Sequence, residues 1–135
     1  MSSQNVAIKV FKSTGTTTGN AASTPKIEGL RVPDVFKDVN AVAGGSITTV
    51  WTPTSGKRVV FMGLTVSVSA ACSLLFEDNS AGAGNFVFRT PKLLADTPYT
   101  FDLGNGVALS AVDNVLKVTS SAAANITGTI YGVEL

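Results

Sequence analysis

Residues that could do acid–base or metal chemistry are few in this 135-residue chain. It contains no histidine and one cysteine, Cys72. A Ser-His-Asp triad and a histidine-containing zinc site therefore cannot form within the chain. We expect Cys72 to be a small buried apolar residue, with a reactive thiol as the alternative, because it has no cysteine partner in the chain.

The carboxylates and the glycine-rich stretches also suggest no reaction. Glu77 and Asp78 are adjacent, and adjacent residues on a strand point to opposite faces of a sheet. The segment lacks the spaced Asp, Asn and Gly residues of a calcium loop. Residues 82–84 and 104–106 are predicted to be turns, because neither opens a helix after a strand as a phosphate cradle does. The sequence thus predicts no enzyme, no cofactor and no metal site.

Two aromatic residues are candidates for stacking on a ligand. Trp51 is the only tryptophan, and at the end of a predicted strand it could stack on a sugar ring. Tyr99 is the second candidate, and a carbohydrate-binding protein would expose one of the two. The alternative is that Trp51 fills one end of the fold, which the nearby Pro53 and the lack of an accompanying aromatic cluster favour.

Hydrophobic periodicity predicts the elements that must position these residues. Val60, Met62, Leu64, Val66 and Val68 occupy every second position, which is the pattern of a β-strand. We therefore predict an all-β fold, a single antiparallel β-sandwich or jelly roll that spans residues 46–135. Further strands are expected near residues 47–51, 72–77, 86–89, 99–103, 107–109, 115–119 and 125–135.

Residues 1–45 are predicted to form an extended N-terminal arm and linker. Residues 13–25 are polar and have nothing to bury. Plain disorder is the alternative, but the apolar side chains on both sides of this stretch are numerous for a segment that stays solvated. The candidates for contacts with a partner are Val6, Ile8, Val10 and Phe11 before the stretch, and Leu30, Val32, Val35 and Phe36 after it.

Charge and hydropathy narrow the range of partners. The net charge is +1 and the pI is about 7.8, so the sequence predicts no nucleic-acid partner. No apolar run approaches the roughly 20 residues of a membrane helix. The first residues lack the basic and apolar regions of a signal peptide, so we expect synthesis in a cytoplasm.

Three stretches, residues 51–58, 97–110 and 125–132, resemble small jelly-roll virion proteins of tailed phages. This group includes capsid decoration (auxiliary, cement) proteins and related head-fibre or tail-tip modules. The resemblance implies a structural protein on the capsid surface of a virion, a homotrimer that binds the major capsid protein of a phage shell. Its arm would clasp neighbours by adding a strand to them. The alternative is a carbohydrate- or receptor-binding module of a phage tail or head fibre.

Overall fold

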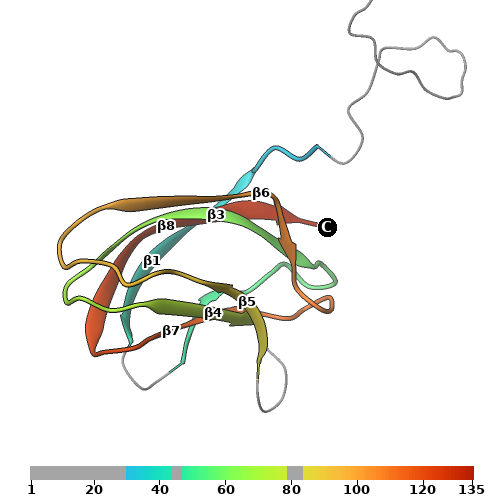
Figure 1. The fold of residues 1–135 in the computed structure, drawn as a ribbon. Helices are drawn as coiled ribbons and strands as arrows, with labels where there is room; N and C mark the ends of the chain where they lie inside the picture. Colours follow the sequence, from blue (N-terminus) through green and yellow to red (C-terminus); the bar gives the residue numbers. More distant parts are fainter. Residues whose placement is uncertain (1–29, 44–46, 79–83) are drawn as a thin grey trace, which may run out of the picture. The chain divides into compact units, whose positions relative to one another are not determined.

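The computed structural model describes residues 30–43, 47–78 and 84–135; the candidates Val6, Ile8, Val10 and Phe11 lie outside these ranges. The described strands all lie in one compact unit, Arg31–Leu135, and no described residue is helical. They form two packed sheets (Figure 1), so the predicted β-sandwich is confirmed. The strands are β1 (Val35–Ala43), β2 (Thr48–Trp51), β3 (Val59–Val68), β4 (Leu74–Asp78), β5 (Asn85–Arg89), β6 (Tyr99–Ala108), β7 (Leu116–Ser120) and β8 (Ala124–Glu134).

The sheets have four strands each, and every named pair is antiparallel. Sheet one has the order β1-β8-β3-β6, and sheet two has the order β2-β7-β4-β5. Strands β1, β2, β3 and β4 therefore pair in turn with β8, β7, β6 and β5. This is the pairing of one long antiparallel hairpin that folds over on itself. The four edge strands are therefore β1 and β6 in sheet one and β2 and β5 in sheet two.

The sandwich begins with β1, upstream of the boundary at residue 46 that the sequence suggested. All nine residues of β1 pair with β8, from Val35 opposite Gly132 to Ala43 opposite Ala124. Val39 in the middle of β1 is buried in the core. Charged residues interrupt the apolar pattern of this stretch, which is why the pattern alone indicates an arm rather than a strand.

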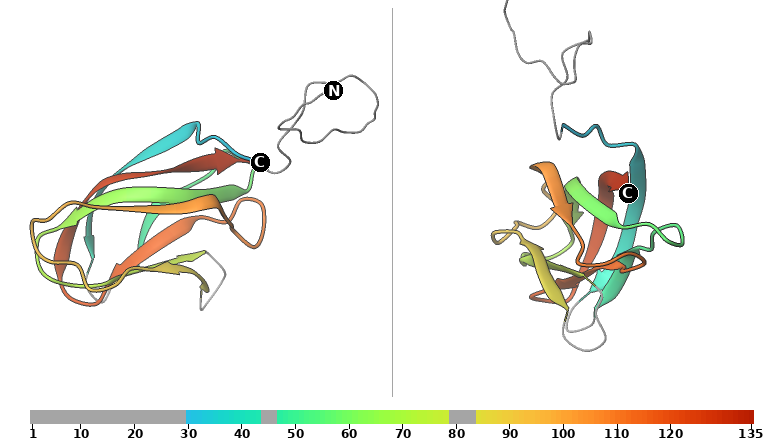
Figure 2. Two further views of the ribbon diagram at one scale, coloured as in Figure 1. Left: turned by 45° about the horizontal axis from the view of Figure 1, so that its top comes forward. Right: turned by 90° about the vertical axis from the view of Figure 1, so that its right-hand side faces the viewer.

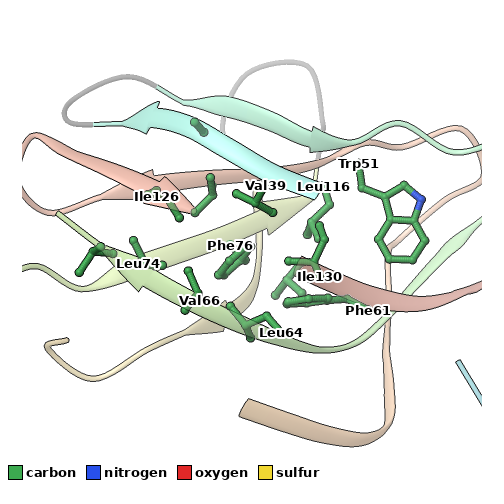
Figure 3. Close-up of a cluster of buried hydrophobic side chains, with 14 of the residues drawn as sticks. Val39, Trp51, Phe61, Leu64, Val66, Leu74, Phe76, Leu116, Ile126 and Ile130 are labelled. Carbon is green, nitrogen blue, oxygen red and sulfur yellow. The ribbon is translucent and has the colours of Figure 1, made fainter. Parts of the chain in front are cut away.

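The core lies between the two sheets and is rich in aromatic and branched side chains (Figure 3). Phe61 from sheet one and Phe76 from sheet two meet at its centre, with their ring centroids 5.1 Å apart. Cys72 is also buried here, as expected, and burial raises the pKa of its thiol. Other large side chains with almost no exposure are Trp51, Leu64, Leu74, Leu93, Leu109, Leu116, Ile126 and Ile130.

A β-bulge in β3 divides the alternating series that predicted this strand. Phe61 lies opposite Gly132 and Gly63 lies opposite Tyr131, so Met62 is an extra residue. An extra residue reverses the faces on which the following side chains lie. Leu64, Val66 and Val68 consequently belong to the main core, whereas Val60 and Met62 join Val133 in a separate buried cluster. We call this the outer cluster, because it lies on the side of sheet one that faces away from sheet two.

Glycines in β6 cover part of the outer cluster. The sequence predicted a turn at residues 104–106, but β6 is one strand whose pairing jumps from Asp102–Gly63 to Val107–Phe61. Gly104 and Gly106 have φ values of +63° and +91°, which glycine adopts without strain. A Cβ on Gly106 would lie 2.7 Å from the side chain of Val60 and 2.8 Å from that of Met62. The backbone of this bulge therefore packs directly on the outer cluster.

Candidate interaction surfaces

The residues that lead into β1 form a strap, residues 31–34, between the two edges of sheet one. Arg31 donates from its backbone N to Oδ1 of Asn105 at 3.1 Å and from Nη1 to the carbonyl oxygen of Asn105 at 3.0 Å. At the other end, the backbone N of Asp34 donates to the carbonyl oxygen of Gly132 at 3.0 Å. Asn105 belongs to β6 and β1 is the opposite edge, so the strap turns across the sheet, as the right-hand view of Figure 2 shows.

The strap and the start of β1 expose large apolar side chains. Val32 is 76% exposed and Phe36 is 61% exposed, and the Phe36 ring lies 6.0 Å from that of Tyr131. Val35, between them, is partly buried and packs against the main core. Leu30, the one described residue of the unit that precedes Arg31, is 61% exposed. Three of the four candidates in this stretch are therefore accessible, and Val35 contributes to the core instead.

Trp51 is buried and offers no face to a sugar ring. Its side chain is 1% exposed, and its Nε1 donates to Oε2 of Glu134 at 2.9 Å. The other carboxylate oxygen of Glu134 accepts from the backbone N of Thr54 at 3.1 Å. Burial opposes ionisation of Glu134, but these hydrogen bonds outweigh it and lower the pKa of the carboxyl. Trp51 is thus a structural residue that fills part of the fold, which was the alternative to a stacking platform.

Tyr99 is likewise held within the fold. It is partly buried at the side of the sandwich where β5 and β6 form the edges, and its ring stacks on Phe101 with centroids 6.3 Å apart. Phe101 in turn lies 5.6 Å from Phe88 of sheet two. The Tyr99 hydroxyl accepts a hydrogen bond from the backbone N of Leu94 at 3.0 Å. These contacts join the two sheets, so the ring is used in packing.

Asp78 is a buried carboxylate with a structural role. It is 2% exposed, and its Oδ2 accepts from the backbone N of Ser110 at 2.7 Å. Asn85 Nδ2 lies 3.4 Å from Oδ1. Burial raises the pKa of Asp78, but the hydrogen bonds from Ser110, Asn85 and Asn114 have the larger combined effect and lower it. The carboxylate therefore stays ionised and ties the end of β4 to the segment after β6.

The outer face of sheet two contains a shallow pocket of about 170 Å³. Its one charged residue is Arg89, an exposed side chain of β5. No sequence pattern indicated this site, because its residues come from three strands and become neighbours only through strand pairing. A lone arginine on a predicted strand gives no signal of its own. The pocket is lined by Ser73, Leu75, Arg89, Thr119, Ser120 and Ser121.

The described residues contain no cluster of three or more Cys, Asp and Glu side chains that could hold a metal ion. They also include no helix of the length and hydropathy needed to cross a membrane. Comparison with known proteins found no match for this chain among family models, curated proteins or solved structures.

Proposed function

We propose that this chain is a structural virion protein that decorates and stabilises a phage capsid. In this proposal it binds the major capsid protein of the shell as a homotrimer. The observation that best supports it is the exposure of two large apolar side chains, Val32 of the strap and Phe36 at the start of β1. Isolated exposed apolar residues are common, but two large ones within five residues favour a protein-binding surface.

The strap gives this surface a defined position on the sandwich. The hydrogen bonds of Arg31 and Asp34 hold the backbone on both sides of Val32. A partner that buries Val32 and Phe36 therefore does not have to order this segment first, which lowers the entropic cost of binding. Complete burial of each side chain would contribute about 1.5–3 kcal/mol.

The segment that precedes the strap supplies the second part of the proposal. Val6, Ile8 and Val10 alternate in the sequence as residues of a strand do. Added to a sheet edge of a neighbouring subunit, such a segment gains main-chain hydrogen bonds. In a trimer, three weak contacts act together, and their combined affinity exceeds that of any single one.

The test is co-sedimentation with expanded, undecorated shells of a tailed phage whose genome encodes this chain. We expect the wild-type protein to saturate at a fixed ratio per shell subunit, and the double variant Val32→Asn/Phe36→Ser to bind at least tenfold more weakly. Leu94→Asn is the matched control, because Leu94 is also 61% exposed but lies outside this segment. Equal binding by the double variant and the control would contradict the proposal, as would a wild-type protein that does not sediment with the shells.

A carbohydrate-binding module was the alternative from the sequence. Neither Trp51 nor Tyr99 presents an open ring, so a glycan site on this protein has to be built from other residues.

A further inference from the structure

We propose that the pocket on the outer face of sheet two binds an acidic sugar residue. Arg89 would pair with the sugar carboxylate, and the hydroxyl groups of Ser73, Thr119 and Ser121 would bind its ring oxygens. The site is separate from the strap, and the inference does not depend on the proposed role in a capsid.

Strand pairing brings the polar groups of the pocket together. Leu75 of β4 lies opposite Arg89 of β5 on one side and opposite Thr119 of β7 on the other. Neighbouring strands are about 4.8 Å apart, so this row of three side chains spans about 10 Å. Ser73 and Ser121 form the next row, where the backbone N of Ser121 donates to the carbonyl oxygen of Ser73 at 2.9 Å. Residues two apart on a strand are separated by about 6.7 Å, so all five side chains surround one small space.

Among the described residues, Arg89 forms no ion pair. Lys117, another cation on this face, lies directly opposite Glu77, and opposite charges across a strand pair stabilise each other. Arg89 instead lies opposite the apolar Leu75. The pocket lining includes no Asp or Glu. The Arg89 guanidinium is therefore available for a carboxylate, to which arginine can donate two parallel hydrogen bonds.

The hydroxyl groups favour a sugar over a simple anion. The Ser121 hydroxyl oxygen accepts from the backbone N of Ser73 at 2.9 Å, so its own hydrogen remains free to donate. Leu75 supplies a partly buried apolar floor for the C–H groups of a sugar ring. An acetate ion would pair with Arg89 but has no hydroxyl groups or ring to occupy the remaining space.

The size of the pocket limits the ligand to a single ring. Its volume of about 170 Å³ is small, whereas pockets for drug-sized ligands begin at about 300 Å³. One monosaccharide unit that carries a carboxylate, free or at the end of a glycan, matches the size and the chemistry of this site.

The experiment is a titration of the ¹⁵N-labelled full-length protein with glucuronate, followed through the backbone amides of Ser73, Thr119 and Ser121. We expect saturable shifts with a Kd on the order of 1 mM, which corresponds to a weak single-site interaction. Glucose, which lacks the carboxylate, and acetate, which lacks the ring, should each bind at least tenfold more weakly. Binding of glucose as tight as that of glucuronate would overturn the role of Arg89, and binding of acetate as tight would overturn the assignment to a sugar.

Two charge variants complete the test. Arg89→Gln should lower the affinity for glucuronate at least tenfold, whereas Lys117→Gln should change it less than twofold. Both remove one positive charge from the same face, so an equal loss in the two variants would show only non-specific attraction and would overturn the proposal. Failure of these experiments would leave shell binding unaffected, because the strap is unchanged in every variant.

Discussion

The outer faces of the two sheets differ in how deeply their apolar side chains are buried. On sheet one, Val60, Met62 and Val133 point away from the main core and are nonetheless buried. On sheet two, Leu75 occupies a similar outward position and remains partly exposed beside Arg89. The outer face of sheet one is thus covered at the outer cluster, although Phe36 on the same face is exposed, whereas the outer face of sheet two is open around Arg89.

Glycine explains much of the difference. The cover on sheet one depends on backbone that approaches other backbone and side chains closely, at Gly106 in the β6 bulge and at Gly132 in β8. The central strands of sheet two, Leu74–Asp78 and Leu116–Ser120, contain no glycine. Their outward side chains Leu75, Glu77, Lys117 and Thr119 are all partly exposed, so this face is accessible to a ligand.

The largest effect should come from Gly132→Ala. A Cβ at this position would overlap the carbonyl oxygen of Val60, which is backbone and cannot rotate away. We expect a loss of about 3 kcal/mol or more in the free energy of unfolding, measured by urea denaturation.

Gly104→Ala is the matched control in the bulge. Gly104 has a φ of +63°, and a Cβ added to it would meet no atom within 4 Å, so the substitution should cost only backbone strain of about 1 kcal/mol. A cost at Gly132 no greater than that at Gly104 would show that the close approach of β8 to β3 at Gly132 does not matter for stability.

The next comparison removes one apolar side chain from each outer face. Met62→Ala should cost about 2–4 kcal/mol, because Met62 is 4% exposed and its loss leaves a cavity in the outer cluster. Leu75→Ala should cost less than about 1 kcal/mol, because the side chain already borders solvent in the pocket. Similar losses in chemical denaturation would mean that the side chains of Met62 and Leu75 are equally well packed.

The sequence predicted the class of fold better than its details, for reasons visible in β3. The alternation of Val60–Val68 correctly identified a strand, since a two-residue period is a local property. The bulge at Met62 is set by pairing with β8, so the sequence could not show that Val60 and Val68 lie on opposite faces. Gly104 and Gly106 indicate a turn in the sequence, because the pairing of β6 with β3 is likewise not a local property. Their tolerance of positive φ is local, and the sequence does show it.

The candidate residues show the same limit. The sequence favoured a Trp51 that fills part of the fold, but it could not identify its hydrogen-bond partner Glu134, which is 83 positions away in the sequence. The pocket around Arg89 depends on the pairing of β4 with both β5 and β7. Exposed apolar residues such as Val32 and Phe36 were easier to identify, because they stand out among polar neighbours in a segment with little room for a core of its own.

Acid should weaken the two sheets through one carboxylate each, Glu134 at the end of β8 and Asp78 at the end of β4. Both pKa values are lowered in the folded protein. Their contribution to stability is therefore complete above the ordinary carboxyl pKa values of about 4 and is lost as the pH falls through the lower, folded values. Thermal unfolding followed from pH 7 to pH 2 should show this loss.

Glu134→Gln and Asp78→Asn should each flatten the fall in stability at low pH. Asp78 is almost completely buried, whereas Glu134 is partly exposed, so we expect Asp78→Asn to remove more of the pH dependence. An unchanged pH profile in both variants would show that other groups cause the acid response.

The smallest effects on stability should come from substitutions at the strap and at the pocket, and the two should differ. Asn105→Ala removes the side-chain acceptor for Arg31 on the covered face, and the loss of this hydrogen bond should cost about 1 kcal/mol. Arg89→Gln on the open face should change stability by less than about 0.5 kcal/mol, since the residue is exposed and lies opposite an apolar side chain. If Arg89→Gln were the more destabilising of the two, Arg89 would be a structural residue, and its loss of ligand binding could no longer be attributed to a missing contact with a carboxylate. A neutral Arg89→Gln variant, by contrast, makes any loss of glucuronate binding a direct measure of that contact.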